Sequence, residues 1–160
     1  MGLGLASASE ELSEGRLGKV LGYRLAKASA VADGVFKRQV GQVTDLKPVE
    51  FSLLALAHQN IGVGPARLAH ALATSRPRAS QLLDHLAERG LIERLPCAAD
   101  GRGFEIHVTS EADRLIANAL DRLLAAERSV TSCLSEAELA MLLELLRRVA
   151  EAVAASEPPV

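Results

Sequence analysis

The sequence is poor in aromatic residues, in cysteine and in long apolar runs. Its 160 residues include three Phe, one Tyr and no Trp, so it lacks the stacking platforms on which oligonucleotide-binding barrels hold single strands. Two cysteines are too few for a disulfide framework. No apolar run approaches the roughly 18 residues of a membrane span, and the first residues do not form a signal peptide. We therefore expect a cytoplasmic chain without membrane contact.

Charge is nearly balanced over the whole chain but is unevenly distributed along it. The formal net charge is −2, which gives no global attraction to nucleic acid. Residues 16–38 nevertheless carry six basic side chains and one acidic one, and residues 65–108 carry six Arg and five acids. Residues 111–160 carry nine acids and five Arg, so an acidic C-terminal region offsets basic segments elsewhere. The total therefore argues only mildly against DNA binding.

The hydrophobic share of 49% comes mainly from Leu and Ala, which both favour helices. Helix starts are indicated by Pro48 and Pro65, by Ser75 as an N-cap candidate, by either Thr109 or Ser110 as a second one, and by the capping box that begins at Ser135. The predicted helices cover residues 10–41, 48–59, 65–72, 76–89, 110–131 and 135–155.

The apolar period changes after Gly90. Residues 91–95 and 104–108 are short runs with β-type residues, and a loop rich in Gly, Pro and Asp separates them. This pattern predicts a β-hairpin. The expected fold class is therefore mainly α with a small β-hairpin, in one chain without a second domain.

The order helix, tight turn, helix and two-stranded wing is that of a winged helix-turn-helix. In such folds the second helix of the pair enters the major groove. The helix over 76–89 suits this role, because its N-terminal end carries Arg, which pairs with guanine, and Gln, which pairs with adenine. Its free N–H groups also favour a phosphate. The predicted DNA contacts are Arg76, Arg78, Ser80 and Gln81.

The segment from Ser75 to Arg94, together with Leu68-Ala69, Asp100-Gly101-Arg102 and Val108-Thr109, resembles the MarR family of bacterial winged-helix regulators. The resemblance covers nearly the whole chain. It implies a DNA-binding lobe over 48–109 and dimerisation helices over 10–41 and 110–155. It also implies a homodimer that controls transcription in the cytoplasm, usually as a repressor.

The same resemblance implies further binding residues. In the wing, Asp100 would orient Arg102 toward double-stranded DNA, in a pseudo-palindromic operator read by the dimer. Repression in the family is usually relieved by a small molecule or by oxidation. The ligand cleft lies between the dimerisation arms and the DNA-binding lobe. Polar contacts there are expected from Tyr23, Arg24, Lys27 and His58.

Cationic groups at this site would suit a carboxylate, a phenolate or the phosphates of an acyl-CoA. The positive charge of residues 16–38 agrees with an anionic ligand. We therefore expect an anionic aromatic compound or its CoA thioester as effector.

Other classes of function find little support. No nucleophile elbow, P-loop or GxGxxG fingerprint is present, so neither an enzyme nor a cofactor is expected. The four histidines, at 58, 70, 85 and 107, share no metal-ligand spacing, and we expect no metal site. Cys97 and Cys133 are expected to be inert thiols. The alternative that stays open is a dimeric adaptor on the same scaffold that does not bind DNA.

Overall fold

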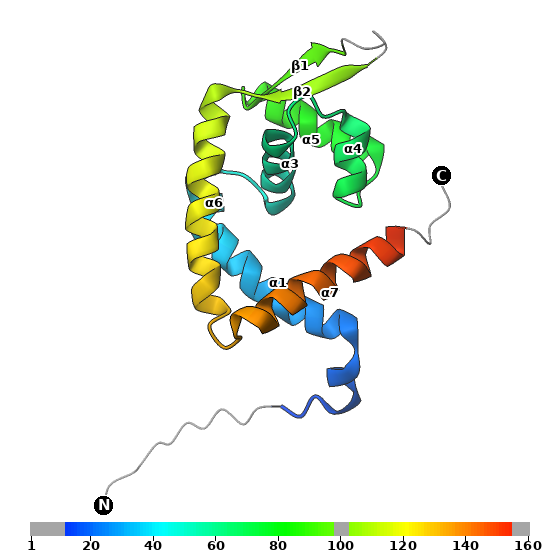
Figure 1. Ribbon diagram of the computed structural model, residues 1–160, viewed down its shortest axis with the longest axis vertical. Helices are drawn as coiled ribbons and strands as arrows, with labels where there is room; N and C mark the ends of the chain where they lie inside the picture. The colour runs from blue at the N-terminus through cyan, green and yellow to red at the C-terminus, as the bar shows by residue number, and fades with distance from the viewer. Residues whose placement is uncertain (1–11, 98–102, 155–160) are drawn as a thin grey trace, which may run out of the picture.

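The computed structural model describes residues 12–97 and 103–154, and Figure 1 shows a mostly helical chain with one two-stranded hairpin. The predicted fold class is therefore confirmed. The hairpin and three helices form a compact lobe at one end of the molecule, and the remaining long helices extend away from it.

The N-terminal region, predicted as one helix over 10–41, is divided into several pieces, so this prediction is wrong. Gly15 has φ +49°, a left-handed conformation that does not continue a helix, and Val20 is extended. Residues 10 and 11 lie outside the described part of the chain. The pieces are the 3-10 helix η1 (Gly15–Lys19), the helix α1 (Leu21–Phe36), the π-helical turn η2 (Lys37–Gly41) and the short helix α2 (Gln42–Thr44).

The lobe has the predicted helix-turn-helix and wing. Ser75 caps its second helix, because the hydroxyl accepts a hydrogen bond from the Arg78 N–H. The hairpin is antiparallel with Arg94 opposite Ile106, and the Ile106 N–H also donates to the Val63 carbonyl. The elements are α3 (Pro48–Gln59), α4 (Pro65–Ala71), α5 (Arg76–Glu88), β1 (Ile92–Pro96) and β2 (Phe104–Val108).

One apolar core joins this lobe to the long helix α6 (Ser110–Val130) and to the end of α1. Leu54, Leu83 and Ile106 of the lobe are completely buried, and Ile116 of α6 packs in the same cluster. Each such side chain contributes about 1.5–3 kcal/mol when it leaves water. The lobe and α6 are thus held together by the protomer's own core.

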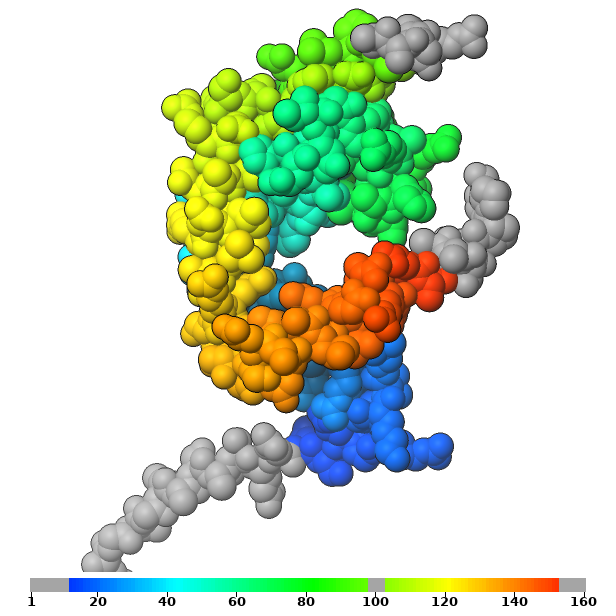
Figure 2. Space-filling model, viewed as in Figure 1, coloured from blue at the N-terminus to red at the C-terminus, as the bar shows by residue number. Residues whose placement is uncertain are grey.

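The last helix, α7 (Glu136–Ala154), stands apart from the lobe. Figure 2 shows an open space between α7, in orange and red, and the helices of the lobe. Its first turn carries the predicted capping box, because the Ser135 N–H donates to Glu138 and the Ser135 hydroxyl accepts from the Glu138 N–H. No residue of α7 between 136 and 152 is buried. The apolar face of this helix is therefore exposed in the single chain.

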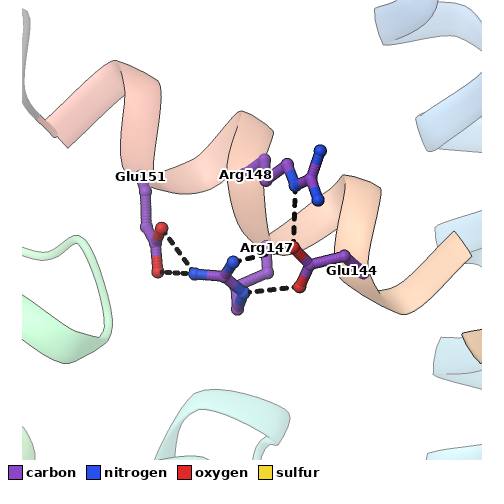
Figure 3. Close-up of polar contacts among 4 residues, drawn as sticks. All are labelled: Glu144, Arg147, Arg148 and Glu151. Carbon is purple, nitrogen blue, oxygen red and sulfur yellow. Dashed lines mark hydrogen bonds and ion pairs between the residues drawn. The ribbon is translucent and has the colours of Figure 1, made fainter. Parts of the chain in front are cut away.

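The opposite face of α7 carries a ladder of ion pairs within the helix (Figure 3). Arg147 donates to Glu144 and to Glu151, and Arg148 also donates to Glu144 at 2.7 Å. Hydrogen bonds from Arg147 and Arg148 lower the pKa of Glu144 to about 2. The charges of this face are thus neutralised by neighbours one turn away.

Candidate DNA interface and effector site

The N-terminal end of α5 presents the predicted DNA-contacting side chains to solvent. Arg76, Arg78, Ser80 and Gln81 are all exposed. The opposite face of the helix is buried, as predicted, through Ala79, Leu82, Leu83 and Leu86. Burial of one face orients the other outward, with the helix N-terminus, which favours anions, beside the two arginines.

The wing stands next to α5 and is joined to it by an ion pair. Arg94 of β1 lies 2.6 Å from Asp84 of α5, and its guanidinium lies 5.0 Å from the centre of the Phe104 ring. This contact fixes the hairpin relative to α5. The predicted pair Asp100 and Arg102 lies outside the described residues, and its role stays a prediction.

A buried carboxylate ties α5 to α3. Glu50, only 3% exposed, accepts a hydrogen bond from the Lys47 N–H at 2.8 Å. Its other oxygen lies 2.9 Å from Nδ1 of His85. Burial acts to raise the pKa of Glu50, but the hydrogen bonds from Lys47 and His85 outweigh it, and the pKa is lowered.

Arg89, which directly follows α5, forms a second polar contact, between the end of this helix and the segment before α3. Its guanidinium donates to the carbonyl of Thr44 at 2.6 Å and to the carbonyl of Asp45 at 3.0 Å. Our sequence reasoning missed both ties. The only signal was the acidic residue in the first turn of α3, which suggests a cap and does not identify a partner on α5.

Three of the four predicted effector-binding residues lie together on α1. Tyr23, Arg24 and Lys27 surround the carboxylate of Glu14 and line an open cavity of about 740 Å³. His58 is not part of this group, because its ring pairs with Asp113 of α6, with 2.7 Å between the two atoms.

A second cavity, of about 520 Å³, lies between α6 and the segment that joins α1 to α3. Gln39, Val43 and Thr44 line one side, and Asn118 and Arg122 of α6 lie on the other. Thr44 thus contacts this cavity and also accepts the hydrogen bond from Arg89.

The described residues, 12–97 and 103–154, also bear on other kinds of site. There, no three His, Cys, Asp or Glu side chains are placed to hold a metal ion. Within the same part of the chain no helix has both the length and the apolar character needed to cross a membrane. Cys97 is half-buried and Cys133 is exposed, and both are free thiols.

The lobe, with an exposed helix end beside a hairpin, defines a winged helix-turn-helix protein. A sequence model of the MarR family matches residues 44–103. A protein of Thauera aromatica assigned to transcriptional regulation of the hcr operon is 26% identical over 87% of this chain and 84% of its own length.

Solved structures agree with this assignment. The transcriptional repressor CouR bound to a 23-mer DNA duplex is 30% identical, with a TM-score of 0.78 over 88% of this chain and 99% of that one. CouR bound to p-coumaroyl-CoA is 31% identical, with a TM-score of 0.73 over 88% of this chain and 98% of that one. The chain belongs to the MarR family of transcriptional regulators.

Proposed function

We propose that this chain is a homodimeric repressor that binds a pseudo-palindromic operator in double-stranded DNA and leaves it when a small anionic effector binds. The observation that carries the proposal is the N-terminal end of α5. Two arginines and two hydrogen-bonding side chains are exposed there, on a helix whose other face is anchored in the core. The similar repressor CouR, solved with a DNA duplex, supports this use of the lobe.

In this proposal residues 48–109 form the DNA-binding lobe. Arg76 and Arg78 bind guanine edges or phosphates, Gln81 reads adenine, and Ser80 supplies a further hydrogen bond. In the wing, Asp100 orients Arg102, whose guanidinium contacts the neighbouring backbone. Two lobes, related by the twofold axis of a dimer, would match the two halves of a pseudo-palindrome.

Exposed apolar side chains support dimerisation through residues 10–41 and 110–155. They include Leu21, Leu25 and Val31 of α1 and Leu142, Leu143 and Leu146 of α7. A soluble monomer rarely leaves apolar surface of this extent uncovered. A second copy of the chain would bury these faces against each other.

The effector is proposed to be an aromatic acid or its CoA thioester. Tyr23, Arg24 and Lys27 supply two positive charges and a phenol hydroxyl to one cavity, which suits a carboxylate or a phosphate. CouR solved with p-coumaroyl-CoA supports this class of ligand. His58 would contribute from the α3 side only if the partner chain or a rearrangement brings it to the same ligand. To release DNA, the ligand must bind the DNA-incompetent arrangement more tightly than the competent one.

The test is fluorescence anisotropy with a labelled duplex taken from the DNA upstream of the protein's own coding sequence. We expect the affinity to fall as salt rises, with a slope that reflects the number of phosphates contacted. Arg78→Ala should weaken binding by about 1–3 kcal/mol if Arg78 reads a base. Arg128→Ala, which removes an exposed arginine from the last turn of α6, is the matched control and should leave binding unchanged.

Two results would contradict the proposal. If the affinity for the duplex does not change with salt concentration, the protein does not contact phosphates, and an adaptor that does not bind DNA is favoured. Equal losses in the Arg78 and Arg128 variants would show that net charge alone, and not the end of α5, determines the affinity.

A further inference from the structure

The carboxylate of Glu14 is held by three side chains of α1. One oxygen accepts hydrogen bonds from the Lys27 ammonium at 2.7 Å and from the Tyr23 hydroxyl at 2.9 Å. The other lies 2.8 Å from a terminal nitrogen of Arg24. Both oxygens of the carboxylate are therefore bound by groups that the effector proposal assigns to a ligand.

The three donors are held in place by contacts of their own. The Arg24 Nε–H donates to the carbonyl of Gly18 at 2.8 Å, which orients the guanidinium. The Lys27 ammonium lies 5.5 Å from the centre of the Tyr23 ring, within the range of a cation–π contact. This geometry satisfies a carboxylate at both oxygens, as a binding site for a free acid does.

Glu14 stays ionised in this setting. The hydrogen bond from Lys27, followed by the one from Tyr23 and the charge of Arg24, lowers the pKa of Glu14. The same contact with Glu14 raises the pKa of Lys27. The site therefore holds a charged carboxylate opposite charged donors at neutral pH.

The segment that supplies Glu14 has little else to hold it within its own chain. η1 contributes no buried residue, Leu12 is 92% exposed, and Leu17 is 50% exposed. The ion pairs of Glu14 are weak, because its partners Arg24 and Lys27 are more than half exposed, and water and salt screen such pairs. A segment with few apolar contacts opens easily.

We propose that Glu14 is an internal ligand, which fills the carboxylate site of Tyr23, Arg24 and Lys27 until the carboxylate of a small aromatic acid displaces it. The proposal rests on the proposed effector role of these three residues. Displacement would release the segment of residues 12–19 from α1, so that ligand binding and the position of this segment are coupled.

The first test compares the binding of benzoate and benzamide to full-length protein by calorimetry. Removing the competing carboxylate in Glu14→Gln and Glu14→Ala should tighten benzoate binding about threefold to tenfold. Benzamide, which has no charge, should show no such gain. Glu127→Gln, at an exposed glutamate of α6, makes the same change in net charge and should match the wild type. Lys27→Met should weaken benzoate binding.

The second test measures tryptic cleavage after Arg16 and Lys19, both exposed in η1. Benzoate should speed this cleavage in the wild type, and benzamide should not. The proposal is overturned if the Glu14 variants bind benzoate no more tightly than the wild type, if they do not bind it at tens of millimolar, or if benzoate leaves cleavage unchanged.

Measurements of DNA binding distinguish a failure of this proposal from a failure of the proposed function. One possible result is that the wild type binds its upstream duplex and an aromatic acid releases it. If the Glu14 variants then respond to the acid as the wild type does, only the proposal that Glu14 is an internal ligand is wrong. If no duplex is bound in a salt-dependent way, the proposed function itself fails.

Discussion

Arg89, at the end of the recognition helix, donates a 2.6 Å hydrogen bond to the backbone carbonyl of Thr44, which precedes it by 45 residues. Thr44 ends the helical segment that leaves α1, and its side chain lines the cavity between that segment and α6. A single guanidinium thus connects the position of α5 to the junction between the N-terminal helices and the lobe.

Arg89→Met is therefore expected to reduce stability and to weaken operator binding. A hydrogen bond made by a charged group contributes about 1.5–3 kcal/mol, and because the bond to Asp45 is exposed, the part-buried bond to Thr44 supplies most of the contribution, at the lower end. The free energy of unfolding, measured in urea, should fall by about 1–2 kcal/mol. Operator affinity should fall in addition, because the angle of α5 is no longer fixed at this end. Arg128→Met is the control, and equal affinity in both variants would contradict a positioning role.

The buried carboxylate of Glu50, paired with the half-exposed ring of His85, predicts a specific dependence of stability on pH. The pKa of Glu50 is below its ordinary value of 4.5 in the folded protein. The ionised carboxylate therefore stabilises the fold above that value, and this contribution is lost as the pH falls from 4.5 through the lowered pKa. Urea unfolding at a series of acidic pH values measures the loss.

Glu50→Gln should flatten this part of the pH profile. At neutral pH the variant should lose about 1–3 kcal/mol, because a neutral amide makes weaker hydrogen bonds with the Lys47 N–H and with His85 than the carboxylate does. Glu88→Gln, at an exposed glutamate of α5, the helix that carries His85, should keep the profile of the wild type. A Glu50→Gln profile that still falls as steeply as the wild type's would assign the acid loss to other groups.

The exposed apolar face of α7 predicts that one charge placed there prevents dimerisation. Leu146→Glu would bury a carboxylate in the proposed interface, where it has no partner. Light scattering after size-exclusion chromatography should give twice the 16.9 kDa chain mass for the wild type and the single mass for this variant.

Ala137→Glu is the matched change on the charged side of α7. Ala137 precedes Glu144 by about two helical turns and Arg148 by about three, so the helical period places it on the same face of α7. This variant should remain a dimer. A monomeric wild type, or two variants that behave alike, would argue against this interface.

Gly90 follows the C-cap of α5 and ends this helix in a left-handed conformation, which costs glycine less free energy than other residues. It has φ +67°, and no atom lies within 4 Å of an added Cβ, so the cost of a substitution is a backbone cost. Gly90→Ala should lose about 1 kcal/mol in urea unfolding, and Gly90→Asn should lose less. Gly64→Ala, at φ −77° and with equally open space, should have a smaller effect.

Local signals in the sequence were sufficient to predict several helix starts and the hairpin. Ser75, Thr109 and Ser135 each cap the helix that follows, and each signal lies within a few residues of the bond it predicts. The hairpin was also predicted, because its strands and loop have distinct compositions. β1 begins and ends only one residue later than expected.

The N-terminal region could not be predicted in the same way. Its apolar period continues through Leu17, Leu21 and Leu25, but the backbone breaks at Gly15 and Val20. The ties of Glu50 to His85 and of Arg89 to Thr44 join helices that are distant in sequence. Such contacts depend on how the helices pack, which a pattern along one helix does not contain.

In the proposed dimer, the ion-pair ladder of α7 would separate assembly from DNA recognition. Arg147 and Arg148 are engaged by Glu144 and Glu151 on their own helix, so they offer little free charge to phosphates. Added salt would then loosen the hold of α5 on the operator, whereas apolar association of the arms would persist. A dimer released by salt would remain a dimer, ready to bind again when the ionic strength falls.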